Sequence, residues 1–114
     1  MSEEYGVVLI SAPSEAGQLI ARALIENRAA ACVQIVPGVT TMYWWKEKVE
    51  YDEEVLLVVK TLQSRLEKIE YLLKELHPYE VPELVFLPIR GGSEKYLAWL
   101  AESVHHGEFD TPSM

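Results

Sequence analysis

The chain is poor in cysteine, in basic residues and in long apolar runs. It has one cysteine, Cys32, in 114 residues, so no disulfide can form within the chain, which fits a reducing cytoplasm. Ten lysines and arginines stand against 18 acidic residues, a net charge of −8, and a surface of that sign repels phosphate backbones. No apolar run reaches the ~18 residues of a membrane span, and residues 1–4 are polar and acidic, unlike a secretory signal. We expect a cytoplasmic protein that binds neither nucleic acid nor membranes.

The common catalytic signatures are missing as well. The sequence has no G-x-S-x-G elbow, no G-x-x-x-x-G-K-[ST] phosphate loop and no C-x-x-C pair. Cys32 lies within an apolar segment, AAACVQI, without a neighbouring base, and buried thiols of this kind are ordinarily inert. We therefore predict that the protein is not an enzyme.

The composition is that of a folded domain. Apolar residues make up 49% and charged residues 25%, a balance that favours a packed core over disorder. The length suits one domain and is too short for two. We predict a single domain over residues 1–107 and a frayed tail over 108–114, where no periodic pattern remains.

Hydrophobic patterning predicts the order β-α-β-β-α-β-α. Runs rich in β-branched residues predict strands, and apolar residues at three- and four-residue spacing predict helices. Ser14 and Ser93 are placed as helix N-caps, and Pro88 indicates a sheet edge. The predicted strands are 5–10, 29–36 with 39–45, 49–60 and 84–89, with a hairpin tip near Lys46, and the predicted helices are 14–26, 63–76 and 93–104.

Two βαβ-like halves of this kind form a four-stranded antiparallel sheet, because crossover connections are right-handed. Both main helices then cover one face. The predicted class is α+β, a ferredoxin-like βαββαβ fold with an extra C-terminal helix. The strands are apolar throughout, so the second face also needs a cover, and another subunit is the simplest candidate.

Tyr43, Trp44 and Trp45 follow one another near the hairpin tip. Neighbouring residues of a strand point to opposite faces, so both indoles cannot enter one core. Tryptophan and tyrosine are frequent where interfaces bury large apolar areas. We predict contacts between subunits at Tyr43 and Trp44, with a ligand platform as the alternative.

His77 ends a predicted helix beside the segment PYEVPE. Its two prolines fix the directions of Tyr79, Glu80 and Glu83 at low entropic cost. A histidine with a carboxylate can hold a borderline transition metal. The structural alternative is a histidine that stops the helix near a hydrogen-bonded tyrosine, and spacing alone leaves both interpretations open.

Two other groups of titratable residues have simpler interpretations. Five carboxylates lie within residues 47–54, but the D-x-D-x-D-G pattern of a calcium loop is absent. We expect a solvated flank of the hairpin there. His105 and His106 follow the third helix, whose C-terminus favours positive charge.

Several short motifs lie along nearly the whole chain, from about Val7 to Leu100. They are AACVQI (30–35), PGVT (37–40), YWWK (43–46), EEVLL (53–57), KT (60–61) and LHPYEVPE (76–83), with SAP (11–13), LPI (87–89) and YLxWL (96–100). Taken together, these motifs resemble the CutA divalent-cation tolerance family.

The resemblance implies a protomer similar to PII signalling proteins, assembled as a homotrimer in which sheet edges and long hairpins meet across subunits. It also implies tolerance to copper and other divalent cations. Some members bind Cu(II), and their candidate ligands are a first-strand cysteine and the histidine before Pro-Tyr. Here that histidine is His77, and Ile10 stands at the cysteine position. The predicted metal ligands are therefore His77, Glu83 and Cys32, and no cofactor is obligatory.

On this basis we predict a non-enzymatic, trimeric protein of divalent metal-ion homeostasis. Its partners are copies of itself and divalent cations such as Cu²⁺. A cation or small anion would bind in clefts between subunits, lined by Trp45, Lys60, Tyr79 and Glu80. The alternative is a PII-like signalling module that reports a metabolite to a protein partner, for which the hairpin over residues 43–54 looks too stiff.

Overall fold

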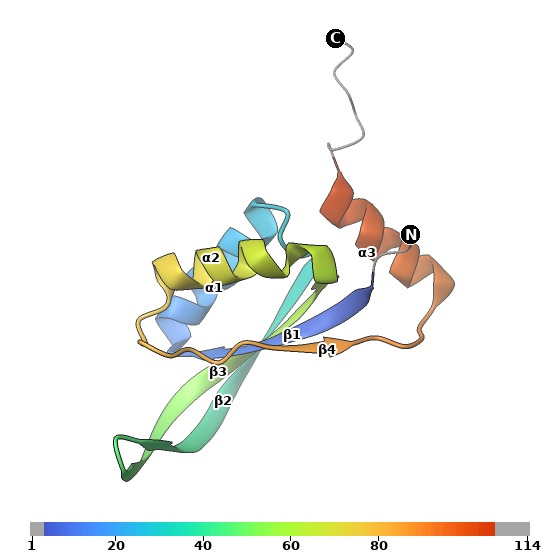
Figure 1. Ribbon diagram of the computed structural model, residues 1–114. Coiled ribbons are helices and arrows are strands. Elements are labelled where there is room, and N and C mark those ends of the chain that lie inside the picture. Colours follow the sequence, from blue (N-terminus) through green and yellow to red (C-terminus); the bar gives the residue numbers. More distant parts are fainter. Residues whose placement is uncertain (1–3, 107–114) are drawn as a thin grey trace.

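The computed structural model describes residues 4–106, and the predicted tail at 108–114 lies outside that range. The elements follow the predicted order, with a short 3-10 turn ahead of the second helix (Figure 1). Their bounds are β1 Tyr5–Ala12, α1 Ser14–Glu26, β2 Cys32–Trp45, β3 Lys48–Leu62, η1 Gln63–Arg65, α2 Leu66–Leu76, β4 Val85–Pro88 and α3 Glu94–His105.

The four strands form one antiparallel sheet in the order β2-β3-β1-β4. Helices α1 and α2 lie together on one face of it, and α3 lies at the end of the sheet away from the hairpin tip (Figure 1). Strand β4 is an edge strand and contains Pro88, as predicted. The ferredoxin-like α+β fold with an extra C-terminal helix is confirmed.

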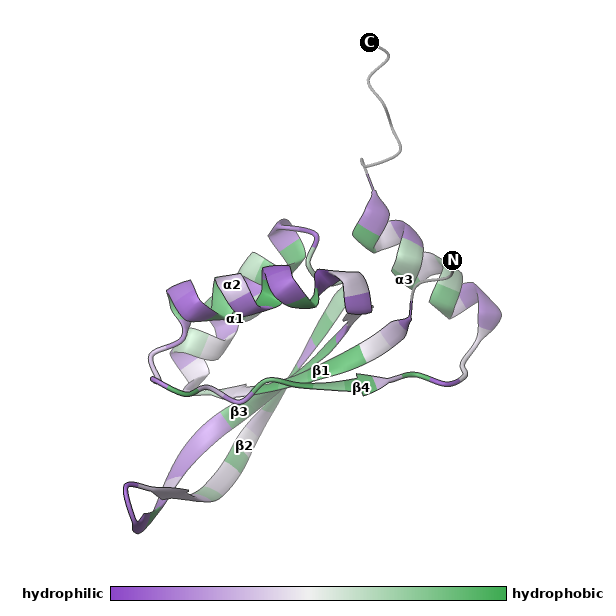
Figure 2. Cartoon of the chain, viewed as in Figure 1, coloured by the Kyte–Doolittle hydropathy of each residue, from purple (hydrophilic) through white to green (hydrophobic). Residues whose placement is uncertain are grey.

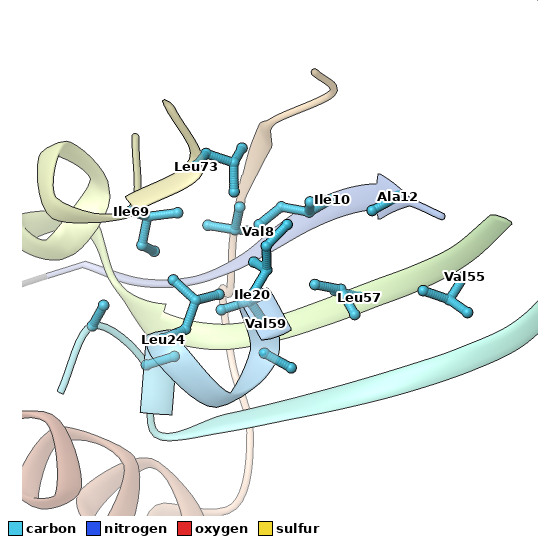
Figure 3. Close-up of a cluster of buried hydrophobic side chains, with 13 residues drawn as sticks. Val8, Ile10, Ala12, Ile20, Leu24, Val55, Leu57, Val59, Ile69 and Leu73 are labelled. Carbon is cyan, nitrogen blue, oxygen red and sulfur yellow. The ribbon is translucent and has the colours of Figure 1, made fainter. Parts of the chain in front are cut away.

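The core lies between the sheet and the two helices. Alternate residues of β1 and β3 point toward the helices, because side chains of a strand alternate between faces. Gly17 lets α1 approach closely, since a Cβ there would meet Val55 Cγ2 at 2.5 Å. The buried residues of this core include Val8, Ile10, Leu57 and Val59 of the sheet, Ile20 and Leu24 of α1, and Ile69 and Leu73 of α2 (Figure 3).

The opposite face of the sheet has no helix over it. The hydropathy colouring shows hydrophobic residues along β1 and β4 (Figure 2). In a single chain Val36, Val85 and Leu87 are 41–45% exposed, and other apolar residues of this face are half-buried. By strand register, this open apolar face consists of Val7, Leu9, Val36, Leu56, Val58, Val85 and Leu87.

Strands β2 and β3 run past the rest of the sheet as a two-stranded arm. Strand β1 ends opposite Val55, whereas β2 and β3 stay paired as far as Trp45 and Lys48. The arm helps to make the chain elongated, with extents of 55 × 32 × 23 Å. Its turn consists of Lys46 and Glu47, which confirms the predicted tip.

Both turn residues have positive φ, 50° and 67°, as a type I′ hairpin turn requires. Such turns prefer Asn and Gly, and the left-handed conformation costs other residues roughly 1–2 kcal/mol each. The sequence therefore gives no usual signal for this turn type, although the fold adopts it.

Three local predictions have clear outcomes. Ser14 does not cap α1 with its side chain: Pro13 is the capping residue, and its carbonyl accepts from the Gly17 N–H at 2.8 Å. Ser93 caps α3, since its Oγ accepts from the Tyr96 N–H at 3.2 Å. The strand predicted from residue 29 begins at Cys32, because residues 28–30 turn back from the end of α1.

Candidate functional site

A cleft of about 510 Å³ lies at the base of the arm. One wall comes from the arm and the other from the loop between α2 and β4. Because that loop contains Pro78 and Pro82, its backbone is stiff and holds its side chains in place. The lining residues are Ser11, Thr41, Tyr43, Trp44, Trp45, Glu54, Tyr79, Glu80, Val81, Pro82 and Glu83.

Glu54 is the most unusual residue of this cleft, because it is acidic and yet only 4% exposed. Its Oε2 accepts a hydrogen bond from the Tyr79 hydroxyl at 2.7 Å. Its Oε1 is buried and has no hydrogen-bond partner among the described residues. The prediction of a solvated flank is therefore wrong at Glu54, because this residue lies where the arm joins the sheet and Tyr79 covers it.

His77 holds the loop against the end of β1. Its Nδ1 accepts from the Tyr79 backbone N–H at 3.1 Å, which leaves the ring proton on Nε2. Nε2 then donates to the Ser11 carbonyl at 2.8 Å. The Tyr79 ring lies 4.7 Å from the imidazole, centroid to centroid. These contacts agree with the structural interpretation of His77, a helix-stopping histidine beside a hydrogen-bonded tyrosine.

The structure separates Cys32 from the other two predicted metal ligands, His77 and Glu83. Glu83 lies near His77 through Ser11, whose Oγ donates to Glu83 Oε1 at 3.1 Å. Cys32, however, pairs with Lys60 of β3, whereas Ser11 pairs with Leu56. These two β3 residues are four positions apart along the strand, a distance of about 13 Å. Within residues 4–106 no three His, Cys, Asp or Glu side chains are grouped to hold a metal ion. A metal site at these residues stays a prediction.

Three of the four predicted ligand-cleft residues line this one cleft: Trp45, Tyr79 and Glu80. The fourth, Lys60, does not line it. Lys60 lies toward the other end of β3, with its Nζ 5.9 Å from the centre of the Tyr96 ring. Within one chain Lys60 therefore lies away from the cleft, and its place in a ligand cleft stays a prediction.

Tyr43 and Trp44, predicted as subunit contacts, line the same cleft. Trp44 is 74% exposed, which agrees with the expectation that at least one indole stays outside the core. Tyr43 points along the arm, and its hydroxyl donates to Asp52 Oδ2 at 2.5 Å. Whether these residues contact another subunit stays a prediction.

The cleft is strongly acidic. Glu54, Glu80 and Glu83 line it, and none of its described lining residues is lysine, arginine or histidine. The hydrogen bond to Asp52 raises the pKa of Tyr43 to about 12. Burial, followed by the hydrogen bond to Glu54, raises the pKa of Tyr79 as well. Such a field favours a positively charged ligand over an anion.

These two tyrosines predict a late phase in alkaline titration. A tyrosine ordinarily ionises near pH 10, so the Tyr43 contribution to stability is complete below about pH 10. It is lost as the pH rises through about 12. In a spectrophotometric phenolate titration, Tyr43→Phe should remove one of the last steps of the curve. If Tyr43→Phe removes an early step instead, Tyr43 is not held by Asp52.

Sequence reasoning missed Ser11 and Glu54 as site residues. Glu54 stands last in an acidic run, and nothing in that run separates it from its solvated neighbours. The only signal is its position directly before the apolar stretch that begins at Val55. Ser11 belongs to the SAP motif, which by itself indicates no role for its side chain.

By its fold and its site, the protein is a ferredoxin-like α+β protein with a long β-arm and an acidic, aromatic cleft at the base of that arm. A family model described as CutA1 divalent ion tolerance protein matches residues 6–103. The divalent-cation tolerance protein CutA of Thermus thermophilus is 52% identical over 98 residues, 85% of this chain and 95% of that protein. The chain belongs to the CutA1 divalent ion tolerance family, which is named for tolerance and not for catalysis.

Solved structures agree with this assignment. The Thermus thermophilus protein superposes with a TM-score of 0.84 at 51% identity, covering 87% of this chain and 97% of that one. The PII-like protein CutA from Nostoc sp. gives 0.81 at 33% identity, covering 88% and 97%. The similarity to PII-like proteins expected for the fold is thus confirmed.

Relatives differ in length and in stated location. Protein CutA 1, chloroplastic, from Oryza sativa is 47% identical over 98 residues, 85% of this chain, but the chain spans only 55% of that protein. In the described part of the present chain, no helix is both long enough and apolar enough to cross a membrane. The cytoplasmic location expected from the sequence stays a prediction.

Proposed function

We propose that the protein acts in tolerance to divalent cations, copper among them, as a non-enzymatic homotrimer in the cytoplasm. Its role is to bind a cation or small ligand in the cleft at the base of the arm, where copies meet. The observation that carries this proposal is the cleft itself, with the buried carboxylate of Glu54 and no basic group among its described lining residues. Membership of a tolerance family supports the same role.

The open apolar face supports assembly. Contiguous apolar patches are rarely left in water, because their burial contributes about 25 cal/mol per Å². Trp44 and Met42, 74% and 69% exposed, form a second apolar surface on the arm, on the side of the sheet that carries the helices. Lys60 lies outside the cleft within its own chain, and its part in a cleft between copies stays a prediction.

A titration of the assembled protein with Cu²⁺ and Zn²⁺ by isothermal calorimetry tests the binding step. We expect a saturable heat with a divalent cation and none with inorganic phosphate. Glu83→Gln should lower the affinity for the cation about tenfold or more, because it removes a negatively charged side chain that lines the cleft. Glu75→Gln, an exposed change on α2, is the matched control. No heat with either cation would contradict the proposal.

A PII-like signalling role is the second candidate. It is supported by the similarity to the PII-like protein from Nostoc sp.. It needs a mobile loop that reaches a protein partner, and the arm of this chain is instead paired as far as Trp45 and Lys48. The cation-tolerance role is therefore the one we propose first.

A further inference from the structure

We propose that the cleft binds an organic cation that carries N–H donors, a primary ammonium or a guanidinium group, and that Glu54 anchors it. This inference rests on the proposed function in one respect, that the cleft is open to a small cation. It adds the chemical class of the ligand and the residue that selects it.

The carboxylate of Glu54 has a place for one more donor. One oxygen already accepts from Tyr79, while Oε1 is buried and without a partner among the described residues. A buried polar atom without a hydrogen bond costs about 1–3 kcal/mol, and more if it is charged. A positively charged N–H donor that enters the cleft gives this oxygen both a hydrogen bond and a compensating charge.

The aromatic walls fit the rest of such a ligand. Tyr43, Trp45 and Tyr79 line the cleft together with the carboxylate, and ring faces attract ammonium and guanidinium groups. The chain already shows this contact near the tip, where Lys46 Nζ lies 5.7 Å from the centre of the Trp45 ring. Glu80 and Glu83 add negative charge around the same space.

A bare divalent ion fits the Glu54 position less well. Calcium and magnesium take six or more oxygen ligands at short distances, and transition metals need several donors in fixed geometry. The described residues offer no group of three such side chains. The volume of about 510 Å³ is instead of the size that holds small organic molecules.

The test compares four small probes on the assembled wild-type protein by calorimetry and tryptophan emission. We expect n-propylammonium and methylguanidinium to bind at least tenfold more tightly than tetramethylammonium, which has the charge but no N–H donor. The neutral n-butanol should give no saturable change. Equal affinity for tetramethylammonium overturns the proposal, and so does the absence of saturable binding of both N–H cations. The partner of Glu54 Oε1 would then be a positively charged side chain of the protein itself.

Variants locate the site. Glu54→Gln removes the charge and should weaken n-propylammonium binding at least tenfold. Glu53→Gln is the matched control, because Glu53 is the exposed neighbour on the same strand, and its affinity should stay within twofold of wild type. Trp45→Leu leaves Glu54 intact and should weaken binding severalfold. Unchanged affinity in both Glu54→Gln and Trp45→Leu overturns the assignment.

The two proposals fail separately. If Cu²⁺ or Zn²⁺ binds and the N–H cations do not, the proposed function stands and the present inference is wrong. If the N–H cations bind at Glu54 and no divalent ion does, the inference stands and the metal-binding step is wrong.

Discussion

Replacing Val58 by aspartate is expected to reduce the particle mass in light scattering threefold, from a trimer to the single chain of 13.0 kDa. Val58 lies in the middle of the open apolar face, opposite Leu9 on β1 and Gln34 on β2. It is half-buried in a single chain, so the isolated fold tolerates a polar side chain there. An interface would instead bury the new charge without a partner, which costs several kcal/mol.

The control for this variant is Leu19→Asp. Leu19 is also apolar and is 61% exposed, but it lies on α1, away from the open face. We expect Leu19→Asp to keep the wild-type mass. If Val58→Asp also keeps it, the copies do not meet through this face, and a wild-type protein that is monomeric would contradict the assembly as a whole.

His77→Ala is expected to lower the free energy of unfolding by about 2–4 kcal/mol, since it removes two hydrogen bonds and leaves a cavity among buried groups. His77 is only 8% exposed, and its imidazole joins the loop after α2 to the end of β1. For a domain of this size the loss corresponds to a drop in Tm of roughly 10–20 °C, measurable by circular dichroism.

His77→Gln separates a positioning role from a metal-binding role. The glutamine amide can still donate to the Ser11 carbonyl, so we expect roughly half of the lost stability to return. A ligand role predicts a different pattern, in which both variants lose copper binding while the stability of the metal-free protein hardly changes. That pattern would contradict the structural interpretation of His77.

Most of the fold could be predicted from sequence because its signals are local. The β-branched run before Lys60 and the leucine spacing of α2 each specify one element, and His77-Pro78 ends α2 where expected. Crossover handedness then leaves few topologies. The uncovered face was predictable for the same reason. The strands are apolar on both faces of the sheet, but the two main helices can cover only one of those faces.

The site was harder to predict, because its geometry depends on contacts between distant segments. Glu54 meets Tyr79 across 25 positions of sequence, and no pattern near either residue indicates that meeting. Lys60 shows the opposite case. It belongs to the KT motif and was predicted to line the cleft, yet the register of β3 pairs it with Cys32, away from the cleft.

The irregularity between Val36 and Val39 in β2 has a consequence for how the molecule avoids fibre-like growth. The outer side of β2 offers unpaired backbone groups over a long strand, which is a template for uncontrolled stacking of chains. Pro37 lacks an N–H, and Gly38, with φ of 69°, breaks the pleat beside it. A foreign strand can therefore pair with only a short stretch on either side. The irregularity thus divides one long exposed edge, which would favour aggregation in a flat sheet, into two shorter edges.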